Sequence, residues 1–411
     1  MNIVKLSIAG LRYRAVNNLL NIVVLALGIA TIVTFLHINR QLEDRFAKDL
    51  NGIDLVVGAK GSPIQLILAN IFHVDNSTGN IPFAEAENLK ENHLIKTAIP
   101  LSLGDNYKGF RIVGTTPDYF SLYLASLAQG EYWHTEMQVV LGSDVASKNN
   151  LKIGDKIVGS HGLTAGGEEH ADFPYAVVGI LKPTGSVIDR LILTDTASIW
   201  HIHEHHDHDE KPTKKSKGKA KDADDDESHQ KEITALLISY KSPLAAATLP
   251  GIINKTSSLQ AASPAFELAR LNKIIGLGGN IVDIFAGILI AIAAFGFFVN
   301  LFNAVSERSY DIALLRSLGA TGQKIFAFII CEGLALSLAG TLLGIILGHV
   351  FAYILQIMIE AQKNISLETL GFEYYEFLII LASIAASVIV ASIPAFWAYR
   401  TNVARNFKNP V

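Results

Sequence analysis

The sequence predicts a membrane protein with four transmembrane α-helices and a large mixed α+β extracytoplasmic domain held on helical stalks. Two observations support this fold class: the spacing of four long apolar stretches along 411 residues, and the uneven distribution of Lys and Arg at their ends. The apolar stretches cover residues 18–38, 281–305, 325–359 and 377–397. At about 1.5 Å of rise per residue, each is long enough to cross a hydrocarbon core of roughly 30 Å.

Basic residues give the expected orientation, because Lys and Arg beside a span are retained on the cytoplasmic side. They occur before the first span, between the second and third spans, and in the tail: Lys5, Arg12, Arg14, Arg308, Arg316, Lys324, Arg400, Arg405 and Lys408. The connection between the third and fourth spans has Lys363 as its one basic residue, against acidic residues that include Glu360, Glu368 and Glu373. Both termini are therefore expected inside, and residues 40–275 outside.

The first apolar stretch is expected to remain as an anchor and not to be cleaved. Its apolar run is too long for a signal peptide, and no small-x-small cleavage site occurs before the polar residues that begin at His37. The expected segments are a cytoplasmic N-terminus with the first transmembrane helix (1–39), a periplasmic α+β domain with stalks (40–275), the second transmembrane helix (276–305), a cytoplasmic helix (306–324), the third transmembrane helix (325–359), a short periplasmic loop (360–376), the fourth transmembrane helix (377–399) and a cytoplasmic tail (400–411).

Composition excludes some function classes. The net charge is −4 and no basic stripe lies outside the membrane flanks, so nothing favours nucleic-acid binding. The single cysteine, Cys331, falls within the third apolar stretch, and a cysteine-free external domain is compatible with a bacterial periplasm. No Ser/His/Asp, Cys/His or paired-carboxylate arrangement stands out, so no catalytic site is expected in this chain.

The external domain is expected to be mixed α+β. Apolar residues at four-residue spacing from Ile38 to Leu50 predict that the first span continues outward as a helical stalk, and residues 266–273 have similar character on the return side. Residues 83–92 read as a helix. Short β-rich runs between turn residues cover 110–114, 138–141, 156–158, 176–181, 191–193 and 235–240.

One segment, residues 201–232, differs in composition and is expected to be a disordered loop, because it has too few apolar residues to bury. Its imidazoles and carboxylates are donors that zinc, copper or nickel accept. The candidate ligands are His201, His203, His205, His206, His208 and His229. A flexible metal collector or sensor and a solvated spacer without specific binding both fit this pattern.

The cytoplasmic connection predicts a short amphipathic helix that ends at Gly319. Its apolar positions, Ile312, Leu315 and Leu318, alternate with charged ones. Such a helix either lies on the inner leaflet or docks in a groove of another protein, since both require the same pattern.

Residues 306–348 resemble the inner signature of the MacB/FtsX-type (LolC/LolE-like) ABC transporter permease superfamily, with an aspartate in place of the usual glutamate at one position. The matching residues are Glu307, Arg308, Asp311, Ile312, Ala313, Leu315, Arg316, Leu318, Gly319, Ala320 and Glu332. The tail around Pro394 and the external segment beginning at Gly109 are also similar to that family, and residues 54–75 resemble a MacB-like branch associated with metal-linked operons.

This resemblance implies a permease without a fused ATPase in the bacterial inner membrane. It further implies a homodimer, and an inner helix inserted into a separate cytoplasmic ABC ATPase that binds ATP and Mg. The coupling residues would be Glu307, Arg308, Asp311, Ile312, Leu315, Arg316, Leu318 and Gly319. No G-x-x-x-x-G-K-[ST] phosphate loop occurs in the chain, and no cofactor of its own is expected beyond a transition metal at the histidine-rich segment.

The expected function is mechanotransmission: ATP-driven motion reaches the periplasmic domain and exports, extracts or effluxes a periplasmic or lipid-linked substrate. The expected contacts are membrane lipid and a periplasmic or outer-membrane partner. Two alternatives remain: a non-transport regulator of FtsX type, and a metal-handling membrane receptor.

Few polar residues interrupt the apolar stretches. Glu332 and His349 are ionisable groups within the third one and are candidates for function, although Glu332 is expected to reach the headgroups and pair with Lys324. No polar row crosses the stretches, which argues against a solute pathway. The repeat of Gly340, Gly344 and Gly348 predicts a face for close helix packing.

We expect the histidine-rich segment to bind zinc and to be dispensable for folding. Its polar composition contributes no core, and acidic buffer should weaken binding because protons compete for imidazole nitrogens. Calorimetry of the external domain with and without residues 201–231 measures the effect. Equal zinc uptake by the two proteins would leave the segment as a solvated spacer.

Overall fold

The structure is a computed structural model that describes residues 15–161, 172–206, 231–270, 319–363 and 371–400, together with scattered residues between 273 and 317. The chain divides into two compact units. We call residues 1–42, 275–362 and 366–411 the helical unit, and residues 43–274 with 363–365 the α/β unit.

The elements alternate between short strands and helices in the α/β unit and are long helices elsewhere. The helices are α2 (Ala15–Asp49), α3 (Pro63–Asn70), α4 (Phe83–Lys90), α5 (Asp118–Leu122), α6 (Ser143–Asn149), η1 (Val187–Arg190), α7 (Thr196–His206), α8 (Pro243–Thr256), α11 (Gly322–Lys363) and α12 (Tyr374–Arg400). The strands are β1 (Leu55–Ala59), β2 (Ile81–Pro82), β3 (Ile95–Tyr107), β4 (Phe110–Thr115), β5 (Leu127–Gly130), β6 (Gln138–Leu141), β7 (Lys156–Ile157), β8 (Ser160–His161), β9 (Tyr175–Leu181), β10 (Leu191–Asp195), β11 (Glu232–Ile233), β12 (Ala235–Tyr240) and β13 (Leu259–Ala262).

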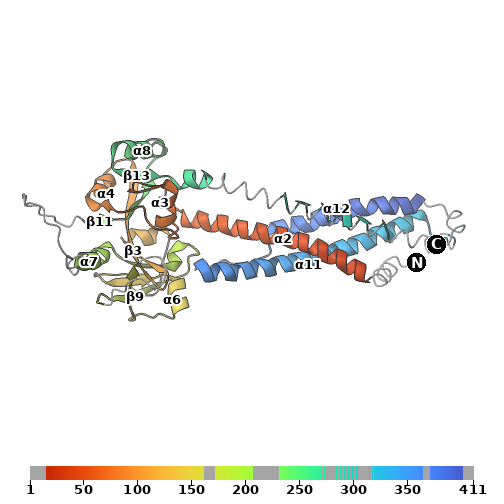
Figure 1. Ribbon diagram of the computed structural model, residues 1–411, viewed down its shortest axis with the longest axis horizontal. Helices are drawn as coiled ribbons and strands as arrows, with labels where there is room; N and C mark the ends of the chain where they lie inside the picture. Colours follow the sequence, from red (N-terminus) through yellow and green to blue (C-terminus); the bar gives the residue numbers. More distant parts are fainter. Residues whose placement is uncertain are drawn as a thin grey trace, which may run out of the picture. The chain divides into compact units, whose positions relative to one another are not determined.

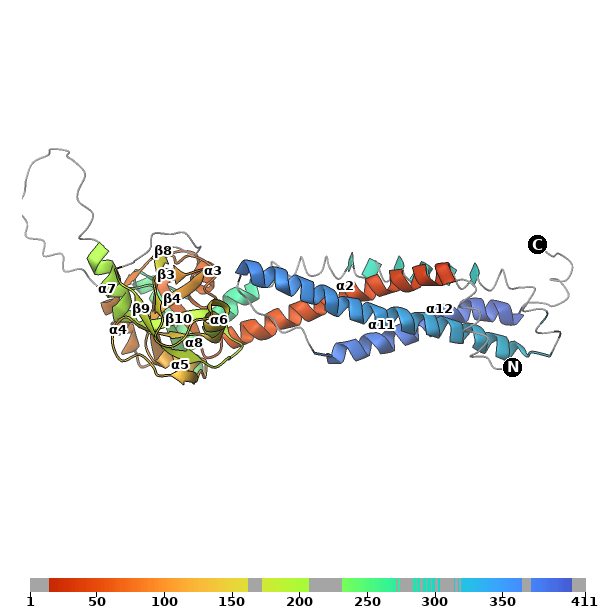
Figure 2. The same cartoon turned by 90° about the horizontal axis from the view of Figure 1, so that it is seen from below.

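Three helices of the described chain, α2, α11 and α12, are long and apolar enough to cross a membrane. They contain three of the four predicted spans. The remaining one, residues 281–305, is described only at scattered positions, which are helical. Nearly all positions of the cytoplasmic helix at 306–318 lie outside the described residues. Both views show α2 and α11 running alongside each other (Figures 1 and 2).

Helix α2 continues well beyond the apolar stretch 18–38 and ends at Asp49 without a break. The helix predicted to continue past the first span is therefore observed. Near its end, Phe46 packs edge-on against Phe72, with ring centroids 5.0 Å apart.

The glycines of α11 lie against α2. A Cβ atom at Gly344 would come within 2.8 Å of both the Ala26 carbonyl oxygen and the Ile29 side chain. A Cβ atom at Gly340 would lie 2.8 Å from the Leu25 side chain, and one at Gly348 would lie 2.7 Å from the Val33 side chain. The absence of side chains at these three positions lets the two backbones approach closely, which is the use that membrane helices make of small residues.

The α/β unit is built on an eleven-stranded mixed sheet with β3 near its centre. The strand order is β13-β1-β12-β3-β4-β10-β6-β9-β5, with β7 beside β9 and β8 beside β3. The pairs β4–β10 and β6–β9 are parallel, and the remaining pairs are antiparallel. Figure 1 shows the helices α4, α7 and α8 placed around this sheet.

All six predicted β-rich runs are strands, and residues 83–90 form the predicted helix α4. Seven of the thirteen described strands were not predicted, among them β3, the longest. Pro100, Gly104 and several polar residues interrupt its apolar pattern, so period-two alternation is weak there. Its pairing with β12 on one side and β4 on the other compensates, because most of its residues are buried between neighbours.

Apolar side chains on both faces of the sheet are buried. Alternate residues of β10 show this most simply: Leu193 packs into one cluster with Val113 and Leu237, whereas Ile192 packs into another with Val139. Both β10 residues are fully buried. Helices cover both faces, so continuous apolar runs rather than strict alternation are expected in the central strands.

The predicted loop at 201–232 begins later than expected, because α7 extends to His206. Ile199 and Ile202 are buried in the core and hold these turns of helix in place. The Trp200 indole donates a hydrogen bond of 2.6 Å to the Glu232 carbonyl oxygen, so the chain leaves and re-enters the fold at the same place. Residues 207–230 lie outside the described residues.

We expect Gly344→Leu to lower the melting temperature of the purified chain. The added side chain would overlap α2 at Ala26 and Ile29, and overpacking of this kind costs roughly 1–3 kcal/mol. Ala339→Leu adds similar bulk at an exposed position of α11 and is the control. Equal melting of Gly344→Leu and the parent would mean that this helix contact contributes little to stability.

Candidate functional site

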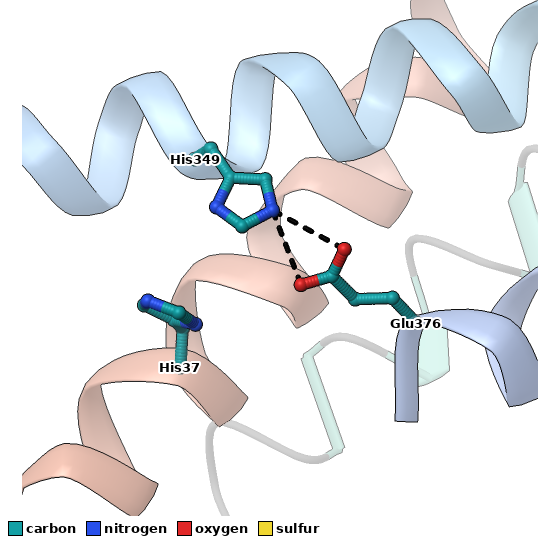
Figure 3. Close-up of side chains that lie close together, drawn as sticks. All are labelled: His37, His349 and Glu376. Carbon is teal, nitrogen blue, oxygen red and sulfur yellow. Dashed lines mark hydrogen bonds and ion pairs between the residues drawn. The ribbon is translucent and has the colours of Figure 1, made fainter. Parts of the chain in front are cut away.

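Three ionisable side chains meet inside the helical unit, one from each of its three long helices. They are His37 of α2, His349 of α11 and Glu376 of α12 (Figure 3). One ligand-type atom from each residue lies within 4.8 Å of the other two. We call these residues the His–His–Glu cluster.

The contacts within the cluster are direct. His349 Nε2 lies 3.1 Å from Glu376 Oε1 and 3.2 Å from Oε2. The two imidazole rings meet edge to face, with centroids 5.3 Å apart. The Tyr375 hydroxyl lies 2.9 Å from His37 Nδ1, and thus fixes the orientation of that ring.

Burial makes this cluster chemically unusual. The Glu376 side chain is fully buried, His37 is 4% exposed and the His349 side chain is 27% exposed. A carboxylate removed from water costs several kcal/mol unless a positive charge or hydrogen-bond donors compensate. Glu376 is in the first turn of α12, where the helix dipole favours an anion, and His349 supplies a second favourable contact.

The local sequence explains how the three helices bring these side chains together. Gly348 precedes His349 and lies against Val33, which is one turn before His37 on α2. The close backbone approach at Gly348 therefore brings the two histidines within contact distance. Next to the cluster, Arg40 pairs with Glu373 at 3.6 Å, and the Glu373 amide donates to Glu376 Oε1 at 3.4 Å.

Sequence reasoning identified only part of this cluster. It selected His349 as a functional candidate, but passed over His37 and Glu376, which are more than 300 residues apart in the chain. A usable signal existed: each is an ionisable group at the end of an apolar stretch. Glu332 is 5% exposed within the helical unit, and its expected place at headgroup level stays a prediction.

The described part of the helical unit also has a half-open cavity of about 240 Å³ that is almost entirely apolar. Its polar lining is limited to Ser337, Ser383 and Ser387. The hydroxyls of Ser337 and Ser383 form a hydrogen bond, with their oxygens 2.9 Å apart. The described part of the unit therefore offers no charged route for a polar solute at this cavity.

A second polar centre lies in the α/β unit, where α2 ends. The Asp49 carboxylate accepts a hydrogen bond of 2.6 Å from the Val187 amide and lies 4.0 Å from the Arg190 guanidinium. The Tyr123 hydroxyl donates to the Asp49 carbonyl oxygen at 3.0 Å. Asp49 is 1% exposed, so the last residue of α2 is fixed inside the core of the unit. We call these contacts the α2 anchor.

Burial dominates the electrostatics of the α2 anchor. It raises the pKa of Asp49 to about 6, although Arg190 and Arg45 act in the opposite direction. Burial also lowers the pKa of Arg190, against the effect of Asp49. The pKa of His73 is held well below its usual range by burial and by the charges of Arg111 and Arg190, so His73 is neutral.

A pocket of about 40 Å³ lies between His73, Arg111 and Arg190. The two arginines already have partners. Arg111 donates to the Asp75 carbonyl oxygen, and Arg190 donates to the Phe72 carbonyl oxygen at 2.9 Å. These contacts tie the segment after α3 to the strands, and they favour a structural role for the pocket.

The predicted coupling residues can be placed only in part. Gly319 has a positive φ of 94°, and Leu314 and Ser317 before it are helical, in agreement with a helix that ends there. The other seven coupling positions lie outside the described residues: Glu307, Arg308, Asp311, Ile312, Leu315, Arg316 and Leu318.

The predicted metal ligands of the histidine-rich segment are divided between α7 and undescribed residues. His201, His203, His205 and His206 belong to α7, whereas His208 and His229 lie outside the described residues. His201 Nδ1 lies 3.7 Å from a Glu136 carboxylate oxygen. Metal binding by this set stays a prediction.

Two protein-family models match the chain. The model of the MacB-like periplasmic core domain matches residues 19–236. The model of the FtsX-like permease C-terminal domain matches residues 284–403. No curated protein matches the chain.

Solved structures similar to the chain include two extracytoplasmic domains. The periplasmic region of MacB from Actinobacillus actinomycetemcomitans is 11% identical with a TM-score of 0.34, and the match covers 54% of this chain and 95% of that one. The extracellular domain of the noncanonic ABC-type transporter YknZ from Gram-positive bacteria is 11% identical with a TM-score of 0.30, over 51% and 99% of the two chains.

We expect the free energy of unfolding of the α/β unit to fall as the pH rises from about 4 to about 6, because Asp49 of the α2 anchor titrates in this range. The pKa of Asp49 is about 6 in the fold and 3.8 as the ordinary value, so in this window the folded state holds a proton that the unfolded chain has released. The stabilising contribution is present below pH 3.8 and lost above about pH 6. It amounts to about 3 kcal/mol at most.

Asp49→Asn removes this titration. Between about pH 4 and pH 6, the parent should lose up to about 3 kcal/mol of unfolding free energy that Asp49→Asn does not lose. The variant therefore becomes more stable relative to the parent as the pH rises. Denaturation followed through the buried Trp133 reports on the α/β unit, and the exposed Asp172→Asn is the control. A parallel pH dependence in parent and Asp49→Asn would contradict the raised pKa.

Proposed function

The chain belongs to the MacB/FtsX-type permease family of ABC transporters, and from this premise we propose that it transmits ATP-driven motion to its periplasmic domain. A multi-pass membrane protein of this family needs a mechanical link between its spans and that domain. The observation that carries the proposal is α2, a single helix that contains the first span and ends at Asp49 inside the α/β unit.

The α2 anchor supports this role. A helix can transmit displacement only when its end moves together with the body that it acts on. The Val187 and Tyr123 hydrogen bonds and the Arg190 contact hold Asp49 by both its side chain and its backbone. Displacement of α2 along its axis would therefore be passed to the strands that follow η1 and to the segment before β1, rather than absorbed in a loop.

We propose that energy enters from the cytoplasmic side through the helix at 306–324. Its amphipathic pattern suits docking in the groove of a separate ATPase, which would bind ATP and Mg. The chain itself lacks the glycine-lysine phosphate loop that such binding requires. Two copies of the permease in the bacterial inner membrane would complete the assembly.

The proposed substrate class follows from the polarity of the described helices. The cavity of the helical unit is apolar apart from three serines, which does not favour a route for ions or small polar solutes. A periplasmic or lipid-linked substrate that is extracted, exported or effluxed by movement of the α/β unit fits better. The histidine-rich segment favours a link to metal as the second candidate function, a metal-handling receptor.

We expect Leu315→Asp and Arg316→Glu to uncouple the ATPase from the permease. Leu315→Asp places a charge on the apolar face that docks in a groove, which costs several kcal/mol, and Arg316→Glu reverses a charge beside that face. ATPase binding should therefore fall at least tenfold while the α/β unit stays folded. The measurements are co-purification of the ATPase and transport-dependent ATP hydrolysis in reconstituted vesicles.

Ser317→Asp adds the same charge to an exposed position of this helix and should leave binding intact. If both coupling variants keep the ATPase and full activity, the docking assignment is wrong. If the ATPase is lost but the phenotype of the intact cell is unchanged, the metal-handling or regulatory alternatives are favoured over transport.

A further inference from the structure

We propose that His37, His349 and Glu376 form a binding site for a divalent transition metal, zinc above all, that joins α2, α11 and α12. This site is separate from the histidine-rich segment and goes beyond the proposed transmission of motion. Its basis is the meeting of two imidazoles and one carboxylate, each from a different helix, in a buried environment (Figure 3).

The donor set matches zinc chemistry. Two histidines and one glutamate are a set that zinc accepts when a fourth position is left for water or another ligand. In a tetrahedral site with bonds of roughly 2.0–2.1 Å, ligand atoms are about 3.3 Å apart. His349 Nε2 and the Glu376 oxygens already have this spacing, at 3.1 and 3.2 Å. The complete set lies within 4.8 Å, so a small rotation of the His37 side chain would close the site.

Neighbouring groups hold the ligands in the way that metal sites require. Ligating histidines bond through their other ring nitrogen to a polar partner, and such partners orient the ring. The Tyr375 hydroxyl makes this contact with His37 Nδ1, and the Glu373 amide donates to Glu376 Oε1. Tyr375 and Glu373 both lie within three residues of Glu376. One turn of chain therefore supplies the ligand Glu376 and the groups that orient Glu376 and His37.

The charges around the cluster favour a cation. Glu376 is a fully buried carboxylate in contact with His349, and beside it Arg40 pairs with Glu373 at 3.6 Å. A buried carboxylate favours a cation as its partner. A divalent cation would balance the Glu376 carboxylate and would also bind His37. A simple ion pair between His349 and Glu376 would not involve His37.

The competing explanation is that ion pair alone, with His37 only packed beside it. The two explanations differ in what His37 and Tyr375 do. In a metal site, removal of either weakens zinc binding; in an ion pair, neither affects metal at all. The metal site also predicts that zinc stabilises the helical unit, because one ion cross-links three helices.

The test uses the full chain, purified in detergent, with the six candidate ligands of the histidine-rich segment replaced by glutamine to remove the other set of imidazoles. Zinc content after gel filtration and the visible spectrum of the cobalt-loaded protein report stoichiometry and coordination. We expect about one ion per chain in this parent. His37→Gln, His349→Gln and Glu376→Gln should each weaken binding at least tenfold, whereas His93→Gln, at an exposed position, should not.

A second variant guards against failure to fold. Tyr375→Phe keeps all three ligands and the packing, and it should weaken zinc binding about 10- to 100-fold through loss of the hydroxyl that orients His37. Zinc should raise the melting temperature of the parent and raise it less in Tyr375→Phe. A parent that binds no zinc, or cluster variants that bind it as the parent does, would overturn the proposal and leave the ion pair.

Discussion

The close contact between α2 and α11 is the constraint on which the rest of the helical unit depends. Gly344 and Gly348 have no side chains, so the α2 backbone at Ala26 and Ala30 can approach them within van der Waals distance. The hydroxyl of Thr34 adds a hydrogen bond of 3.1 Å to the Gly348 carbonyl oxygen. Lipid provides no hydrophobic driving force between helices, so packing and such hydrogen bonds must supply the association.

Two features follow from that contact. The first is the His–His–Glu cluster, because His349 follows Gly348 and His37 is one turn beyond Val33. The second is the position of α2 within the helical unit, where its apolar part lies against α11. In the α/β unit, the last residue of α2 is held by the α2 anchor. Buried ion pairs such as Asp49 with Arg190 contribute little net stability, but loss of one partner is costly, so they favour one defined geometry.

The sequence was sufficient to predict three membrane-spanning helices and a mixed α/β domain, but not the clusters. Long apolar stretches and short β-rich runs are local patterns, which is why α2, α11, α12 and the six strands could be predicted. Strand β3 could not, since Pro100 and Gly104 break its pattern and pairing on both sides compensates. The α2 anchor and the His–His–Glu cluster join residues far apart in the chain, and single polar residues at helix ends give no local sign of their partners.

The histidine-rich segment shows the limit of composition as evidence. Its polar content predicted a loop from His201, yet α7 runs to His206 because Ile199 and Ile202 are buried against the sheet. Two well-placed apolar residues were enough to extend the helix. Composition over a long window is therefore a poor guide to where such a segment begins.

The central claim is that α2 carries motion from the membrane spans to the α/β unit. It is tested most directly by the spin-label distance between Leu338 on α11 and Lys90 on α4, both made cysteine in a Cys331→Ser chain assembled with its ATPase. The account predicts that ATP changes this distance and that Leu42→Pro, which breaks α2, abolishes the change while ATP hydrolysis continues and Leu42→Ala retains it. An ATP-dependent change that persists in Leu42→Pro would contradict the account.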